Sequence, residues 1–115
     1  METDRYIILT ILTNLIDNGI KYADGQVIIN VTVRFEGQHW ILEVQDNGKG
    51  IEKQYLPYIF DKFYRVPSGN IHDVKGYGLG LNYVRELVSV LKGTISVKSD
   101  KGIGTTFTIK FPNYG

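Results

Sequence analysis

The chain has no cysteine, and this absence excludes several kinds of chemistry. Disulfide frameworks, cysteine-based zinc sites and thiol nucleophiles all require that residue. The histidines, His39 and His72, lie far apart in the sequence and have no Ser or Cys partner at a spacing typical of nucleophilic catalysis. We therefore assign no chemistry to either histidine.

Neither sign of charge dominates. Thirteen Lys and Arg residues against twelve Asp and Glu residues give a formal net charge of +1, and both signs are scattered along the chain. A surface dedicated to nucleic acid or to acidic lipid needs a concentration of basic residues. The composition therefore predicts no nucleic-acid partner.

Long apolar runs are also absent. The run Ile7–Leu9 is interrupted by Thr10, whereas a membrane-spanning helix needs ~20 apolar residues. No basic segment followed by an apolar one opens the chain, as a secretory leader would. With 115 residues, of which 43% are hydrophobic, the sequence is expected to form one domain over residues 1–115.

The first part of the chain predicts an amphipathic helix between Tyr6 and Ala23. Apolar residues recur there at the spacing of one helical face, and a row of polar residues flanks that face. The apolar stripe consists of Ile8, Leu12, Leu15, Ile16 and Gly19, and the polar row of Asn14, Asn18 and Lys21.

Alternating apolar residues predict strands in two further regions. Residues 27–35 and 40–46 indicate one antiparallel hairpin, and residues 94–98 and 106–111 a second. Between the hairpins, residues 81–91 predict a helix closed by Gly93 at a C-cap position. Helices on one face of a largely antiparallel sheet make an α+β, two-layer sandwich.

The segment from Asn47 to Gly80 lacks clear periodicity and is punctuated by glycine and proline. A short helix is plausible within it, at Glu52–Tyr58. A connection of this length is usually a lid or a binding segment, so it is the first place to look for function.

Two local motifs near strand and helix ends could bind a ligand, and each has an ordinary structural alternative. In Asn14–Tyr22, two amides one turn apart offer oxygens to a hard cation and Lys21 can reach a phosphate, or the same residues form a solvated helix face. In Asp46–Gly50, an acidic residue is followed by glycines that let the backbone approach a ligand, or that simply make a turn.

Two more motifs lie in the long segment. Gly76–Leu81 places glycines directly before a helix, where backbone N–H groups can bind phosphate, although an isolated glycine-rich loop is weak evidence. Ile59–Arg65 carries two aromatic residues three positions apart. It is either a hydrophobic latch that aims Arg65 at a phosphate or a loop held by core phenylalanines.

The order and spacing of these motifs resemble one family over nearly the whole chain: the catalytic, ATP-binding domain of two-component sensor histidine kinases, within the GHKL superfamily. Each motif is weak alone, and together in this order they are specific. Asn14–Tyr22 is similar to the family's N box, Asp46–Gly50 to its G1 box, Phe60–Phe63 to its F box, Gly76–Gly80 to its G2 box and Gly102–Phe107 to its last glycine box.

The resemblance implies the Bergerat fold, with a mixed, largely antiparallel sheet and a long ATP lid. It also implies ATP and Mg²⁺ as ligands, with Asp46 accepting a hydrogen bond from the adenine amino group, Tyr22 packing on the base and Asn18 ligating Mg²⁺. Thr105 or Thr106 would support the base edge. The implied nucleotide-binding residues are Asn18, Tyr22, Asp46, Gly48, Gly50, Ile51, Phe60, Gly76, Gly78, Leu79, Gly80, Leu81, Thr105 and Thr106.

Catalytic roles are implied for Asn14, Lys21 and Arg65, the last two by balancing phosphate charge. Gyrase-like and chaperone ATPases of this superfamily carry a glutamate general base four residues before the Mg²⁺ asparagine, and here that position is Asn14. An amide does not take up a proton near neutral pH. The resemblance therefore implies phosphoryl transfer to an external histidine rather than rapid hydrolysis.

The family's acceptor histidine lies on a separate helical dimerisation domain, so the chain is expected to be a fragment of a larger, homodimeric receptor kinase. Its expected setting is the cytoplasmic side of a bacterial inner membrane, held there by other parts of the parent, with a response regulator receiver domain downstream. Two alternatives are a nucleotide-binding regulatory module that has lost transfer activity, and an ATPase or anti-sigma serine kinase of the same superfamily. The retained Asn18, Lys21, Asp46 and Arg65 disfavour the former, and Asn14 and the F box disfavour the latter.

Overall fold

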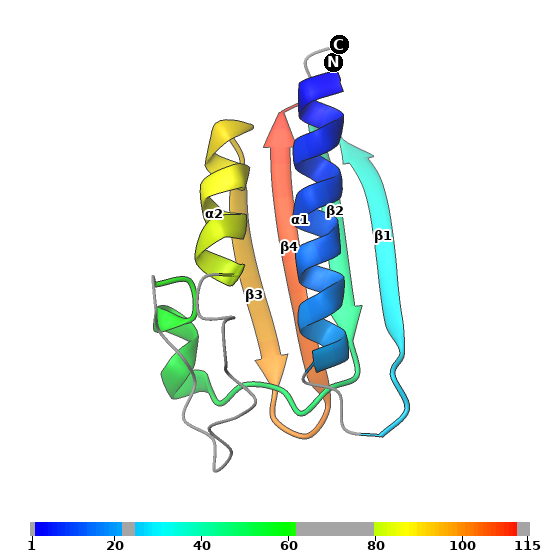
Figure 1. Ribbon diagram of the computed structural model, residues 1–115, viewed down its shortest axis with the longest axis vertical. Helices are drawn as coiled ribbons and strands as arrows, with labels where there is room; N and C mark the ends of the chain where they lie inside the picture. Colours follow the sequence, from blue (N-terminus) through cyan, green and yellow to red (C-terminus); the bar gives the residue numbers. More distant parts are fainter. Residues whose placement is uncertain (1, 22–24, 62–79, 113–115) are drawn as a thin grey trace.

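The computed structural model describes residues 2–21, 25–61 and 80–112 of the chain. Figure 1 shows its secondary-structure elements as two helices against one sheet, with a short 3-10 helix beside them. In chain order they are α1 (Glu2–Lys21), β1 (Ile29–Glu36), β2 (His39–Asp46), η1 (Lys53–Tyr58), α2 (Gly80–Val90), β3 (Thr94–Asp100) and β4 (Gly104–Pro112).

The sheet has four strands in the order β1-β2-β4-β3, and every pairing between them is antiparallel. Both predicted hairpins, β1–β2 and β3–β4, are present, and they are joined through the central pair β2–β4. The expected parallel component of a mixed sheet does not occur among the strands that the structure describes. Both helices lie on the same face of the sheet (Figure 1), which confirms the two-layer α+β sandwich.

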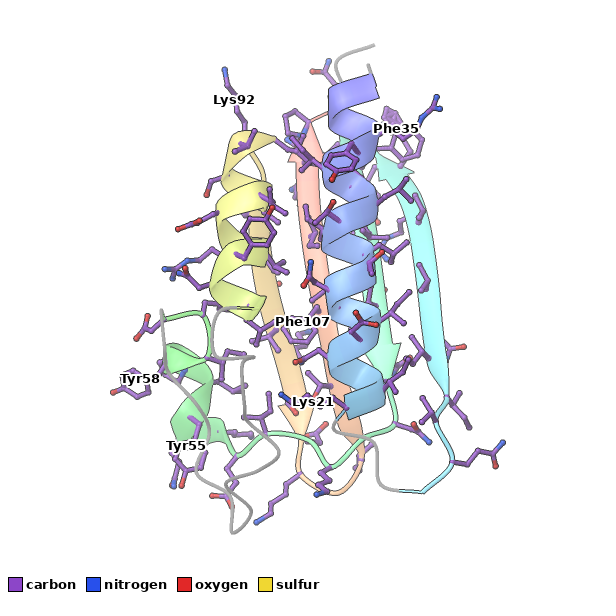
Figure 2. The ribbon with its side chains drawn as sticks, viewed as in Figure 1. Lys21, Phe35, Tyr55, Tyr58, Lys92 and Phe107 are labelled. Atoms are coloured by element: carbon purple, nitrogen blue, oxygen red, sulfur yellow. The ribbon has the colours of Figure 1, made fainter. Side chains whose placement is uncertain are left out.

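The core lies between the helices and the two central strands. Ile11 and Leu15 of α1 are each 1% exposed, and Phe107 of β4 is equally buried; Figure 2 shows Phe107 between α1 and α2. The helix α1 starts at Glu2, about one turn before the predicted Tyr6. Its most buried side includes Ile11, which the predicted stripe omitted, because α1 packs against α2 as well as against the sheet.

The strand β1 follows the predicted alternation, but its apolar face is largely exposed beyond Ile29, which packs against the core. Val31, Val33 and Phe35 pair with Val44, Leu42 and Trp40 of β2, respectively, yet they are 43%, 58% and 45% exposed. The reason is the placement of the helices: α1 packs on β2 and α2 on β3, the opposite edge of the sheet, so neither helix has its main sheet contact on β1. Alternation in the sequence therefore identified the strand but not its burial.

Two helix features differ from their predictions: the type of the short helix and the residue that ends α2. The helix expected at Glu52–Tyr58 is the 3-10 helix η1, which contains Pro57. At the end of α2 the left-handed residue is Lys92, with φ 60°, and not Gly93. The N–H groups of Lys92 and Gly93 donate to the carbonyls of Ser89 and Val88, respectively, each at 2.9 Å, which is the Schellman arrangement.

Gly93 is nevertheless required, because a Cβ there would lie 2.6 Å from the carbonyl oxygen of Lys110. None of the helices in the described ranges is both long enough and apolar enough to cross a membrane.

Candidate functional site

The candidate residues that the structure describes gather at one end of the molecule. The helix α1 and the strands β2 and β3 end there, and β4 begins there, as the lower part of Figure 1 shows. Figure 2 places Lys21 at the last turn of α1 at this same end. The described parts of the motifs at these element ends thus lie at the same end of the molecule.

Asp46, the last residue of β2, is half-buried and held by a local turn. Its Oδ1 accepts a hydrogen bond from the N–H of Gly48 at 2.8 Å. Its Oδ2 is on the side of α1, since a Cβ built on Gly19 would lie 3.5 Å from it. One carboxylate oxygen is therefore used to fix the side chain, and the other lies against Gly19 of α1.

The glycines of two motifs allow backbone segments to cross closely. A Cβ on Gly50, which has φ 76°, would lie 2.2 Å from the carbonyl oxygen of Asp100. A Cβ on Gly104 would lie 2.0 Å from the carbonyl oxygen of Asp46. Neither position leaves room for a side chain. The segment after β2 and the turn before β4 are thus packed directly on each other, joined also by a hydrogen bond from the N–H of Gly102 to the carbonyl of Lys49 at 2.6 Å.

Of the two candidate threonines, only Thr105 lies on the face that carries Asp46. Asp46 and Thr105 are register partners across β2 and β4, and Thr105 is 6% exposed. Successive residues of a strand point to opposite faces, so Thr106 points away from the helices. The structure thus favours Thr105 over Thr106 as the neighbour of Asp46, a choice that the sequence left open.

The hydroxyl of Ser99 on β3 joins this cluster, and the sequence analysis missed it. Its Oγ lies 2.7 Å from Thr105 Oγ1 and accepts from the N–H of Ile51 at 2.6 Å. The signal available in the sequence was its place after Ile95 and Val97 in the alternating pattern of β3, where another buried residue is expected.

The residues of the polar row of α1 differ in their surroundings. The side-chain amide of Asn14 donates to the carbonyl of Thr10 at 2.8 Å, one turn earlier in the helix. Asn18, one turn further on, is half-buried, and the Nζ atom of Lys21 is fully buried. An amide oxygen is a suitable ligand for Mg²⁺, which usually takes few protein ligands and the rest from phosphates and water.

Within the described part of the chain, no group of three or more His, Cys, Asp or Glu residues could hold a metal by itself.

Phe60, within the long segment between β2 and α2, is tied to the core from two sides. Its ring meets that of Phe107 edge-on, with centroids 6.2 Å apart and an interplanar angle of 74°. The side chain of Asn82 on α2 donates to the Phe60 carbonyl at 3.1 Å. Asn82 is a second contact that the sequence analysis did not identify, and next to it Leu81 is half-buried against the core.

Gly80 is the first residue of α2. The remaining predicted residues lie outside the described residues; they are Tyr22, Phe63, Arg65, Gly76, Gly78 and Leu79.

One ion pair lies at the rim of the cluster. Lys101 Nζ is 2.5 Å from Glu52 Oε1, and the hydrogen bond to this carboxylate raises the pKa of Lys101. Both side chains are well exposed, so the pair contributes little to stability.

Comparison with known proteins gives a consistent result. The family model described as "Histidine kinase-, DNA gyrase B-, and HSP90-like ATPase" matches residues 3–115. Sensor protein RprX of Bacteroides fragilis is 44% identical over 111 residues, which cover 95% of this chain and 21% of that protein. Sensor protein CiaH of Streptococcus pneumoniae is 37% identical over 108 residues, covering 94% of this chain and 24% of that protein. The chain thus spans less than a quarter of either relative.

Among solved structures, the mycobacterial sensor histidine kinase MprB is similar, with a TM-score of 0.78 and 27% identity. The match covers 90% of this chain and 70% of that one.

Proposed function

Since this chain belongs to the family of histidine kinase-, DNA gyrase B- and HSP90-like ATPases and is similar to sensor histidine kinases, we propose that it binds ATP with Mg²⁺ and donates the γ-phosphoryl group to a histidine. That histidine would lie on the dimerisation domain of the same, homodimeric sensor kinase. A response regulator receiver domain would then take the phosphoryl group, and the parent would be a bacterial inner-membrane sensor with this domain on the cytoplasmic side.

The observation that carries the proposal is the pair formed by Asp46 and Thr105. A fixed carboxylate acceptor beside a buried hydroxyl suits the exocyclic amino group of adenine, and guanine offers no amino group at that ring position. Ile51 and Phe60 border the same end of the core and would supply apolar contacts to the base. Of the candidate threonines, we retain only Thr105 for this role.

The polar side of α1 supports a place for the phosphates. Asn18 would ligate Mg²⁺ through its amide oxygen, and Lys21 would balance phosphate charge. The first backbone N–H groups of α2, at Gly80 and Leu81, would bind phosphate oxygens. Bound Mg²⁺ would supply charge neutralisation of the phosphates.

The environment of Asn14 favours transfer over hydrolysis. Its amide is bonded to the carbonyl of Thr10 and has no basic character, so water has no general base at this position. In the proposed transfer, a bond forms from a histidine nitrogen to the γ-phosphorus, the bond to the β–γ bridging oxygen breaks, ADP leaves and the imidazole proton passes to solvent. The regulatory-module alternative predicts binding without this transfer.

The proposal is tested by calorimetric titration with a nonhydrolysable ATP analogue, with and without Mg²⁺, and with the matching GTP analogue. Asp46→Asn keeps the shape and an acceptor for the Gly48 N–H but removes the charge. We expect the Kd for the ATP analogue to rise about tenfold or more, while Asp17→Asn on the exposed side of α1 leaves it unchanged. Equal affinity for the GTP analogue, or no effect of Asp46→Asn, would contradict the proposal.

Transfer itself is tested with γ-labelled ATP and a sensor-kinase dimerisation domain added in trans. Acid-labile, alkali-stable label on that domain is the expected result, and its absence despite tight ATP binding would favour the regulatory-module alternative.

A further inference from the structure

Ser99 connects three chain segments through one hydroxyl. Ser99 is 7% exposed on β3, and its Oγ lies 2.6 Å from the N–H nitrogen of Ile51, 3.1 Å from the carbonyl oxygen of Gly104 and 2.7 Å from Thr105 Oγ1. These partners belong to the segment after β2 and to the first two residues of β4. We propose that Ser99 is a positioning residue for nucleotide selection, which sets the orientation of the Thr105 hydroxyl beside Asp46 without touching the nucleotide itself.

The hydrogen-bonding capacity of a hydroxyl determines the direction of each bond. A hydroxyl has one proton and two lone pairs. The Ile51 N–H can only donate, and the Gly104 carbonyl can only accept. All three contacts are satisfied together when Ser99 donates to Gly104, and when Thr105 donates to the remaining lone pair of Ser99. The hydroxyl proton of Thr105 is then used in the hydrogen bond to Ser99, and the Thr105 oxygen offers only lone pairs to a ligand.

This orientation matters because of what lies next to Thr105. Asp46 is its register partner on β2 and is also an acceptor. Gly104 sits directly against the Asp46 carbonyl, so the backbones of the two strands are in close contact at this point. An edge made of two neighbouring acceptors favours a base that presents an amino group. The loss of Ser99 would free the Thr105 hydroxyl to rotate and donate, and this would weaken the preference for amino-bearing bases.

The test compares two ligands that differ only in that amino group: ADP and the 5′-diphosphate of purine riboside. This inference rests on the proposed function, because it assumes that the base lies against Asp46. In Ser99→Ala we expect the affinity for ADP to fall about tenfold, while the affinity for the purine analogue changes less than about twofold. Ser96→Ala, on the exposed face of the same strand, should leave both affinities unchanged.

A merely structural role for Ser99 predicts a different outcome, in which both affinities fall by the same factor. Any result that leaves the ratio of the two affinities unchanged would overturn the inference. The affinities are measured at a temperature where circular dichroism shows each variant to be fully folded.

Thr105→Val provides a second route, because it removes the hydroxyl while keeping the side-chain shape and the Ser99 bonds to Ile51 and Gly104. It should reproduce the selectivity loss of Ser99→Ala, and the double variant should lose no more than either single one. Retained ADP selectivity in Thr105→Val overturns the inference even if Ser99→Ala does not fold. If the unaltered chain binds neither ligand, or binds ADP independently of Asp46, the proposed function fails as well.

Discussion

Asn47 follows Asp46 in the sequence motif, but its side chain is used within the protein. Its Nδ2 donates to the carbonyl of Gln26 at 2.7 Å, and its Oδ1 accepts from the N–H of Ile28 at 2.9 Å. These bonds hold the segment that leads into β1 against the end of β2. Membership of a motif associated with ligand binding thus does not assign a ligand contact to every residue in it.

Asn47→Ala should lower the free energy of unfolding by about 1–2 kcal/mol, because two backbone groups lose their partner at a partly solvated site. Asn47→Asp should cost at least as much, since it places an oxygen against the Gln26 carbonyl. Urea unfolding followed by circular dichroism measures both changes. A loss confined to nucleotide affinity, with stability unchanged, would show that Asn47 contacts the ligand instead.

Gly104 and Gly102 make a matched pair for testing the close crossing of chain segments. A Cβ on Gly104 would overlap the carbonyl oxygen of Asp46, whereas a Cβ on Gly102, with φ 85°, would meet nothing within 4 Å. Gly104→Ala should therefore destabilise by more than about 3 kcal/mol, and Gly102→Ala by only about 1 kcal/mol, from its backbone conformation alone. Thermal unfolding of the two variants compares them directly. Similar losses would mean that β4 shifts to make room.

At the scale of single residues, the sequence could predict the motifs but not the network that supports them. Asp46 is singled out by the order of its motif among the others, since Asp46–Gly50 taken alone is also an ordinary glycine turn. Thr105 could not be separated from Thr106, because the choice depends on the register between β2 and β4. Ser99 and Asn82 act through contacts with distant segments: the alternation of β3 predicts that Ser99 is buried but not which groups it contacts, and no local pattern marks Asn82.

The end of α2 shows how an element can be predicted correctly with its terminal residue misplaced. Lys92 adopts the left-handed conformation that usually selects glycine, and the adjacent Gly93 is needed for a different reason, its contact with the Lys110 carbonyl. A left-handed backbone and a close backbone contact both favour glycine, so the sequence pattern alone predicts that Gly93 is the left-handed residue. Only the position of β4 distinguishes them.

Lys92→Gly should raise the free energy of unfolding by up to about 1 kcal/mol, because it relieves the left-handed backbone strain. Gly93→Ala should lower it by about 2 kcal/mol or more, because the new methyl group would overlap the Lys110 carbonyl. Chemical denaturation of both variants measures whether each substitution raises or lowers the free energy of unfolding. A destabilised Lys92→Gly would indicate that the lysine side chain makes a compensating contact.

Element types followed from periodicity, whereas burial depended on neighbours in space. The exposed apolar residues of β1 obey the same alternation as the buried residues of β2 and β4. Their exposure follows from strand order and helix placement, since α1 packs on β2 and α2 on β3, which leaves β1 at the edge away from α2. Strand order is a property of long-range pairing, which a local pattern does not contain.

For the molecule as a whole, nucleotide binding should appear as added stability. A ligand that binds only the folded state at a hundredfold excess over its Kd adds about 2.7 kcal/mol to the free energy of unfolding, equivalent to several degrees in Tm. The nonhydrolysable ATP analogue with Mg²⁺ should produce this shift, measured by differential scanning calorimetry. Asp46→Asn should reduce the shift and Asp17→Asn should not. An unchanged Tm at saturating analogue would argue against a site formed in the native fold.

The antiparallel pairing of β2 with β4 also has a consequence for the order in which the domain acquires its function. It joins residues 39–46 to residues 105–112, so it closes a loop that includes the long segment, α2 and β3. Pairings of such high sequence separation form late, because the chain between them must be ordered or enclosed first. On a ribosome, Asp46 would emerge well before its neighbour Thr105. Under the proposed function, a growing chain would therefore lack the Asp46–Thr105 pair until β4 is made, and nucleotide binding would indicate that the sheet is complete.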